Sequence, residues 1–296
     1  MTLAPQAIDQ ALAQLTVVVV THHSAHCVAA LAATVQSFPH VIVVDNASSD
    51  DTLARVARDI PHAQVIPLAD NLGFGVANNR GLEQVHTPYA LLLNPDCQID
   101  RESAAVLVET AQAWPQAAIV APQLRGTDGA PELNYGWLRW HWASRGPRAE
   151  GPLCVGHACA AAWLLRCDRT DTPWRFDPGY FLYYEDEDLC ARIFQAHELV
   201  LIEPVATAVH ANRGSVRGKS PLRSEWLRGY HHSRSKIRFQ SLYQGASVAL
   251  AVRRKAMALG VLEVLARVAL LNPRLLARSA GRWWGMCTAA GQVRKR

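Results

Sequence analysis

Two apolar runs, TVVVVT at residues 16–21 and VIVVD at residues 41–45, decide the fold. Unbroken runs of β-branched residues are typical of strands that are buried on both faces of a parallel sheet. A helix is predicted between the two runs, and the SSD run after the second supplies N-capping side chains for another helix at residues 52–59. Strands that alternate with helices over short turns predict an α/β fold with a doubly wound, mostly parallel sheet flanked by helices.

The alternation continues to about residue 123 and then stops. Strands are predicted at residues 16–21, 41–44, 65–68, 89–93 and 118–121, and helices at residues 24–37, 52–59, 75–85 and 102–114. Residues 126–151 are rich in glycine, proline and tryptophan, which predicts an irregular excursion. Structure is expected to resume at residues 158–165, 176–192 and 199–210, before a helical tail from Pro221 onward.

Charge is unevenly distributed along the 296 residues. The formal net charge is +5, but residues 213–296 contain 18 basic and 2 acidic residues, so the preceding part carries a net charge of −11. Such asymmetry predicts separate roles for two regions. We therefore predict one α/β domain at residues 1–220 and a basic, helical C-terminal region at residues 221–296.

The composition argues against several classes of protein. Half of the residues are hydrophobic and 19% are charged, which disfavours disorder. The seven cysteines form no CxxC pair, so neither a zinc ribbon nor a disulfide framework is expected, and a reducing cytoplasm fits best. The first 15 residues lack the pattern of a signal peptide, and no apolar stretch of about 18 residues predicts a membrane span.

The basic C-terminal region has three interpretations. Basic residues alternate there with leucine, valine and the pair Trp283-Trp284, a pattern of amphipathic helices that lie on an anionic membrane surface. The same helices could instead pack on the α/β domain with a solvated basic face. A nucleic-acid-binding surface is the third interpretation. It leaves the acidic residues of the α/β domain unexplained, so no nucleic acid is expected.

Polar residues follow the predicted strands at the edge where ligands bind in such sheets. Thr21, Asp45, Asn71 and Asp96 all occupy such positions, so we expect them to share one crevice. The Asp45 carboxylate could accept the imide N–H of a uracil or thymine base, or it could cap the following turn. Asp96, in the run NPD at residues 94–96, offers a hard oxygen ligand for Mg²⁺ or Mn²⁺, with a proline turn as the simpler alternative.

Three further features could carry chemistry. The glycine loop NLGFGVANNRG at residues 71–81 opens a helix whose N-terminus could approach an anion, although its spacing does not fit a dinucleotide-binding motif. The run YYEDED at residues 183–188 places four carboxylates together, and their repulsion should raise the pKa of at least one of them. His210 ends the last predicted strand, where a histidine is more often structural than functional.

Together these motifs resemble the family 2 glycosyltransferases, and within them the bacterial rhamnosyltransferase-like branch. The resemblance covers residues 15–214 and rests on the order TVVVVT, VIVVDNASSDDT, NLGFGVANNRG, LLLNPD, FDPGYFLYYEDEDLCAR and AVH. It implies a GT-A-type fold for the α/β domain. The chain departs from the family pattern at His22-His23, where Tyr-Asn is usual, which puts base contacts there in doubt.

The resemblance implies a donor site for a nucleotide sugar. Thr21 and Asp45 would line the nucleoside pocket. Asn71, Gly73 and Asn79 would shape the site of the donor sugar and its diphosphate.

Metal and catalytic residues are implied in the same way. The run Asn94-Pro95-Asp96 resembles a variant of the family's DxD motif, in which Asp96 would bind Mn²⁺ or Mg²⁺ with His210 as a second ligand. Asn94 replaces the first acid of that motif, which removes one charge and makes His210 more important. Asp186 matches the general base of the family's ED motif. Its neighbours are candidate acceptor-binding or supporting residues, namely Tyr184 and Glu185.

The implied reaction is a single displacement with inversion. Cleavage of the sugar–phosphate bond leaves negative charge on the diphosphate, which a metal stabilises, while Asp186 takes the proton of the acceptor hydroxyl. dTDP-L-rhamnose is the expected donor and UDP-sugars are the alternative. The expected acceptor is a cell-surface glycan or a lipid-linked glycan of cell-wall or polysaccharide biosynthesis. Asn94 also leaves open a non-catalytic nucleotide-sugar binder. The expected location is the cytoplasm, with a peripheral position on the cytoplasmic face of the inner membrane.

Overall fold

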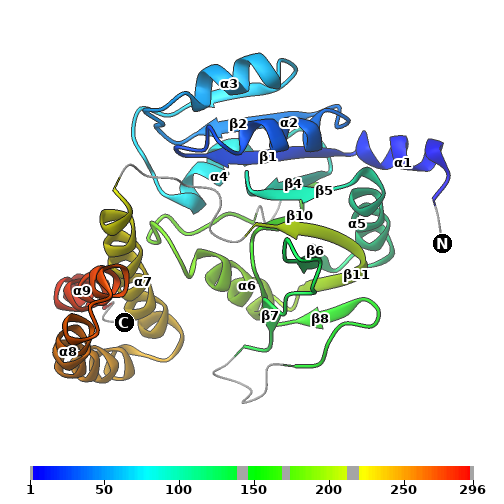
Figure 1. Ribbon diagram of the computed structural model, residues 1–296. Helices are drawn as coiled ribbons and strands as arrows, with labels where there is room; N and C mark the ends of the chain where they lie inside the picture. Colours follow the sequence, from blue (N-terminus) through cyan, green and yellow to red (C-terminus); the bar gives the residue numbers. More distant parts are fainter. Residues whose placement is uncertain (1–2, 139–145, 169–173, 212–219, 294–296) are drawn as a thin grey trace. The chain divides into compact units, whose positions relative to one another are not determined.

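The computed structural model describes residues 3–138, 146–168, 174–211 and 220–293 (Figure 1). The chain forms two compact units. We call Met1–Asp177 with Leu189–Arg217 the sheet unit, and Pro178–Asp188 with Gly218–Arg296 the helical unit. The predicted domain boundary at residue 220 remains a prediction, and the helical unit also contains the run of carboxylates.

The main sheet has the strand order β3-β2-β1-β4-β10-β6-β11-β5, and β8 also pairs with β11. Its strands are β1 Leu15–Thr21, β2 Val41–Asp45, β3 Gln64–Pro67, β4 Tyr89–Leu93, β5 Cys97–Ile99, β6 Ala117–Arg125, β8 Leu153–Val155, β10 Ala162–Arg166 and β11 Leu199–His210. A separate two-stranded sheet pairs β7 Tyr135–Gly136 with β9 His157–Ala158. The four neighbouring strands β3, β2, β1 and β4 all run parallel to one another.

Among the described strands, β5, β8 and β10 run antiparallel to their neighbours in the main sheet. Only residues 94–96 connect β4 to β5, which is too short for a crossover helix, so β5 must reverse direction. β10 inserts between β4 and β6, a position that the sequence did not indicate. The prediction of an α/β fold with a mostly parallel sheet is confirmed.

Helices cover both faces of this sheet (Figure 1). Val17 and Val19 of β1 pack in a core with α1, α2, α3 and α5, whereas Val18 packs in the opposite core with α4 and the part of α6 that belongs to the sheet unit. Because successive side chains of a strand point to opposite faces, this burial explains the unbroken valine run. The helices are α1 Pro5–Leu12, α2 Val28–Val35, α3 Thr52–Asp59, α4 Phe74–Leu82, α5 Arg101–Ala113 and α6 Glu185–Gln195.

The helical unit contains three long helices and the short 3₁₀ helix η1. They are α7 Pro221–Tyr243, α8 Ala246–Ala269, α9 Pro273–Thr288 and η1 Ala289–Gln292. Small residues let α7 and α9 approach closely, because a Cβ on Gly229 would meet the backbone of Arg278, and one on Gly281 would meet the backbone of Trp226. No helix in the described ranges is apolar over a length that could cross a bilayer.

The α7–α9 contact predicts a stability effect. Gly281→Ala should lower the free energy of unfolding by about 1–3 kcal/mol, because the added methyl group would have to displace a helix backbone. Chemical denaturation of the purified chain measures this change. The control is Gly291→Ala, whose added Cβ meets no atom within 4 Å. Equal midpoints for the Gly281→Ala variant and the parent protein would contradict the close packing.

Candidate active site

The carboxyl ends of β1 and β2 place Thr21 beside Asp45 in the parallel register. The Thr21 hydroxyl donates to Asp45 Oδ1 over 2.9 Å, and Ser48 donates its backbone N–H to Oδ2 over 2.9 Å and its hydroxyl to Oδ1 over 2.6 Å. A carboxylate has about four acceptor positions, so these three bonds leave room for one further donor. Asp45 is 1% exposed and closes the turn after β2. Its contact with a nucleoside stays a prediction.

Asn46 is the central residue of this edge and was missed in the sequence. Its side-chain amide donates to Asn71 Oδ1 over 2.9 Å and to the Gly73 carbonyl over 3.3 Å, and its Oδ1 accepts the Leu72 N–H over 2.8 Å. The His22 ring bonds to the Asn46 carbonyl over 2.8 Å. Asn46 is buried, so these bonds hold the glycine loop against the turn after β2. Its position directly after Asp45 is the signal that could have identified it.

Gly73 carries a backbone conformation that only glycine adopts readily, with φ of 84° and ψ of 170°. Its N–H donates to Asn71 Oδ1 over 2.9 Å, so the predicted donor-site residues Asn71 and Gly73 lie together. The loop ends at the N-terminus of α4, where free backbone N–H groups favour an anion. The local geometry is therefore suited to a phosphate group.

Asn79 occupies a different place from the loop residues. Its side-chain amide donates to the Phe176 carbonyl over 2.9 Å, and its Oδ1 accepts the Phe176 N–H over 2.9 Å. This pair of bonds ties α4 to the first residue of the FDPGYFLYYEDED run. The structure thus gives Asn79 a positioning contact, while its predicted contribution to the donor site is still untested.

Asp96 and His210 come together through the pairing of β5 with β11. His210 lies opposite Cys97 in the antiparallel register, and the Ala211 N–H donates to the Asp96 carbonyl over 3.0 Å. Asn94 closes the turn before Asp96, since its carbonyl accepts the Cys97 N–H over 3.0 Å. The side chains of Asp96 and His210 are 3% and 9% exposed. Asp96 Oδ1 lies 3.6 Å from His210 Nε2.

This pair fits a divalent metal. Two ligands that are each about 2.1 Å from one ion lie about 3–4 Å apart, which includes the observed separation. His210 Nδ1 is buried and makes no hydrogen bond with any described residue. In the described ranges, no third His, Cys, Asp or Glu completes a three-residue cluster. Further ligands would have to come from donor oxygens or water.

Backbone strain marks the same regions. Four non-glycine residues with positive φ lie in functional stretches: His23 and Ala47 after β1 and β2, and Tyr183 and Tyr184 before α6. Their φ values are 51°, 59°, 68° and 68°, a conformation that costs on the order of 1–3 kcal/mol each. The two other described cases, His197 and Leu271, follow the ends of α6 and α8, where this conformation is ordinary.

Within the helical unit, α7 holds the segment that carries the predicted base. The Ser235 hydroxyl donates to the Leu182 carbonyl over 2.9 Å, and the Tyr243 hydroxyl donates to Asp188 Oδ1 over 2.9 Å. The Tyr184 ring lies between His232 and Phe239 of α7, with centroid distances of 5.4 Å and 5.3 Å. The basic C-terminal region therefore positions the residues around Asp186, a role that the sequence did not reveal.

Glu185 is the carboxyl group that the acidic run perturbs most clearly. Burial, with the charge of Asp186 as the second cause, raises the pKa of Glu185 well above its usual range. Its Oε2 is buried and has no hydrogen-bond partner among the described residues. Glu185 therefore favours the protonated form beside the predicted base, as expected for one of several adjacent carboxylates.

Glu185 should make stability depend on pH. The unfolded chain releases this proton near the ordinary value of 4.5, whereas the folded chain keeps it to higher pH, so stability falls as pH rises above 4.5. Glu185→Gln should flatten this fall and increase stability at neutral pH, as measured by urea denaturation across pH. Glu102→Gln, an exposed acid in the first turn of α5, is the control. An unchanged slope in Glu185→Gln would refute this assignment.

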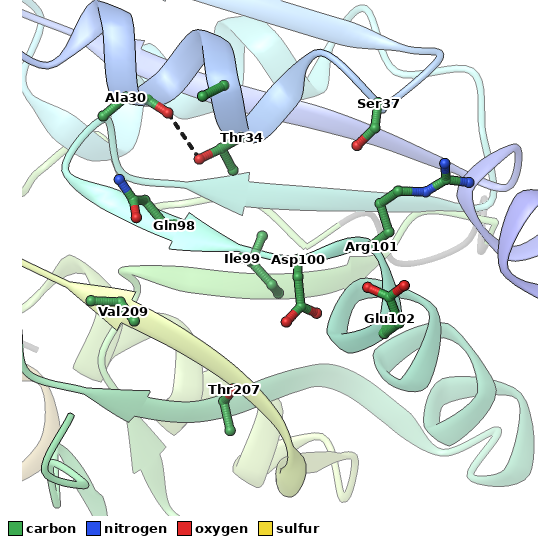
Figure 2. Close-up of a pocket in the computed structure, with 11 residues that line it drawn as sticks. Ala30, Thr34, Ser37, Gln98, Ile99, Asp100, Arg101, Glu102, Thr207 and Val209 are labelled. Carbon is green, nitrogen blue, oxygen red and sulfur yellow. Dashed lines mark hydrogen bonds between the residues drawn. The ribbon is translucent and has the colours of Figure 1, made fainter. Parts of the chain in front are cut away.

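A hollow of about 480 Å³ lies elsewhere on the sheet unit (Figure 2). α2 contributes Thr34 and Ser37, β5 contributes Gln98, and the start of α5 contributes Arg101 and Glu102. No predicted site residue lines it, although all of them lie in the described part of the chain. Asp100, also in its lining, already caps α5 through the Ser103 N–H. The hollow is therefore separate from the candidate active site.

Two named relatives are glycosyltransferases. An N-acetylglucosaminyl-diphospho-decaprenol L-rhamnosyltransferase of Mycobacterium tuberculosis is 29% identical over 254 residues, which are 74% of this chain and 82% of the relative. The low-salt glycan biosynthesis hexosyltransferase Agl10 of Haloferax volcanii is 23% identical over 203 residues, which are 61% of this chain and 62% of the relative.

Solved structures show the same fold. A mannosyltransferase of Pyrobaculum calidifontis in complex with GDP-Man and Mn²⁺ is 17% identical with a TM-score of 0.56, over 94% of this chain and 86% of that one. GalNAc-T7 with UDP, GalNAc and Mn²⁺ is 14% identical with a TM-score of 0.54, over 77% of this chain and 47% of that one. These matches confirm the GT-A-type fold.

The sequence profile of glycosyl transferase family 2 matches residues 16–168, and the chain belongs to this family of enzymes.

Proposed function

We propose that this enzyme transfers L-rhamnose from dTDP-L-rhamnose, with inversion, to a hydroxyl of a lipid-linked glycan. The observation that carries the proposal is the buried pair of Asp96 and His210, which lies at the carboxyl edge of the sheet. A diphosphate at this edge would meet the N-terminus of α4 and a metal held by the two side chains. A nucleotide sugar supplies such a diphosphate.

The sugar and the acceptor are inferred from the mycobacterial relative. Its name specifies L-rhamnosyl transfer to N-acetylglucosaminyl-diphospho-decaprenol, and the match extends over 82% of its length. The same chemistry in this chain would require a thymine or uracil base near Thr21 and Asp45. One acceptor position of the Asp45 carboxylate is still available there. UDP-sugars are the alternative donors, because a thymine methyl group is the only difference between the two bases.

A divalent ion, Mn²⁺ or Mg²⁺, would act as a Lewis acid that stabilises the leaving diphosphate. Asp96 would hold it through a carboxylate oxygen and His210 through Nε2. Asn94 cannot replace the charge of a first aspartate, so His210 supplies the second fixed ligand. The turn from Asn94 to Cys97 and the β5–β11 ladder keep both side chains in place.

Asp186 would act as the general base that takes the proton of the acceptor hydroxyl. It lies at the start of α6, after two tyrosines whose strained backbone fixes the direction of the chain. Glu185, whose pKa is raised by burial, would hold its proton more tightly than an ordinary glutamate and let Asp186 carry the negative charge of the pair. The basic helical unit would keep the enzyme on the cytoplasmic face of an anionic membrane, where a lipid-linked acceptor is presented.

The metal site predicts a specific loss of donor binding. Asp96→Asn and His210→Ala should each weaken the binding of dTDP-rhamnose by about tenfold or more in the presence of Mn²⁺, because the first removes the charge of one ligand and the second removes the other ligand. Calorimetry with Mn²⁺, with Mg²⁺ and with EDTA measures this change. UDP-galactose and UDP-N-acetylglucosamine serve as competing donors. Tight binding of a UDP-sugar alone would change the donor, and binding of no nucleotide sugar would refute the transferase proposal.

The proposed role of Asp186 as the general base predicts an effect on kcat and not on donor binding. Asp186→Asn should lower kcat by roughly 10²–10⁴-fold and leave dTDP-rhamnose affinity unchanged, because it removes a proton acceptor but no donor contact. Glu187→Gln, a neighbouring acid of the same helix, is the matched control and should retain most of the activity. A fall of equal size in both variants would show that the charge of the acidic run, and not one base, is required.

A further inference from the structure

A cavity of about 330 Å³ lies inside the helical unit, between α7, α8 and α9. His232 and Lys236 line it from α7, Leu259 from α8, and Arg282 and Trp283 from α9. One wall is therefore cationic and another is apolar. The donor site proposed above uses none of these residues.

The charges of this cavity favour an anion. Lys236 and Arg282 supply two cations, against the single carboxylate of Glu263. Glu263 already accepts the Ser279 hydroxyl over 2.8 Å and lies 4.0 Å from Arg282. Burial lowers the pKa of His232 to about 4, with the charges of Arg282 and Lys236 as further causes. His232 is thus neutral at pH 7 and can donate one ring N–H to a bound ligand.

An apolar surface begins at the edge of the same cavity. Leu259 is half exposed there, and the helix continues with Leu262 and Leu265, which are 63% and 60% exposed. Leu271, two residues after the end of α8, is 88% exposed. These leucines follow a cationic pocket along one helix, which suits a ligand with a charged head and a long hydrocarbon chain.

The cavity also lies beside the segment that carries the predicted base. The His232 ring meets the rings of Tyr183 and Tyr184 at centroid distances of 5.5 Å and 5.4 Å. Asp186 follows two residues later. His232 therefore lines the cavity and contacts the base segment at the same time, within a single compact unit.

We propose that this cavity binds the diphosphate of the lipid-linked acceptor, whose hydrocarbon chain leaves over Leu259, Leu262 and Leu265. Lys236, Arg282 and the neutral His232 contact the diphosphate oxygens. The sugar that receives rhamnose then extends toward Asp186. This assignment rests on the proposed function for the identity of the acceptor, but the site itself is tested without turnover.

Calorimetry on the full chain tests the site, with farnesyl diphosphate as the probe. Lys236→Gln and Arg282→Gln should each weaken farnesyl diphosphate binding by about tenfold, because each removes a charge-assisted contact. Arg254→Gln removes an exposed cation of α8 that does not line the cavity, and should bind like the parent protein. Leu259→Ser should weaken farnesyl diphosphate but not inorganic diphosphate.

Two further measurements separate this site from its alternatives. The affinity for dTDP-rhamnose should be unchanged in the same variants. If the parent protein does not bind dTDP-rhamnose, the proposed donor is refuted, but the proposed role of the cavity is not. Sedimentation with phosphatidylglycerol vesicles tests a bilayer headgroup as the occupant. If Lys236→Gln and Arg282→Gln weaken vesicle binding but not farnesyl diphosphate binding, the acceptor assignment is overturned. Failure of the parent protein to bind farnesyl diphosphate while it binds dTDP-rhamnose would overturn it as well.

Discussion

The antiparallel pairing of β5 with β11 is the interaction on which the candidate metal site depends. It places His210 opposite Cys97, directly after Asp96, so the hydrogen bonds of the ladder fix an imidazole beside a carboxylate. Two buried polar side chains could not hold such a separation by their own attraction, because burial of each carries a desolvation cost. A slip of one residue in the register would turn His210 to the other face of the sheet and remove the site.

The edge that holds Thr21, Asp45 and Asn46 depends on a second constraint, which is the satisfaction of buried polar groups. Asn46 uses both ends of its amide to hold Asn71, Leu72 and Gly73, and Asp45 accepts three bonds from Thr21 and Ser48. A half-satisfied network in this position would be more costly than an apolar core. The network therefore also compensates for the positive φ of Ala47, within the turn that it spans.

The sequence was most informative where chemistry is local. The valine run of β1 predicted the parallel part of the sheet, because burial on both faces leaves a direct trace in residue type. The place of β10 in the sheet and the clamp of Asn79 on Phe176 could not be predicted, because both depend on contacts between distant segments. The pairing of His210 with Asp96 also depends on a contact between distant segments, and only the family resemblance assigned His210 a role.

The helical unit combines tight internal packing with an exposed apolar helix. α7 packs against α9 through glycines and holds the segment around Asp186, so part of the tail positions the segment of the predicted base. Within the described span of α8, Ala249 is the single buried residue, although the helix carries many leucines and valines. Burial of apolar surface stabilises a protein by roughly 25 cal/mol per Å², and the exposed part of α8 lacks this stabilisation. A helix that positions the segment of the proposed base and another that exposes leucines therefore belong to one compact unit.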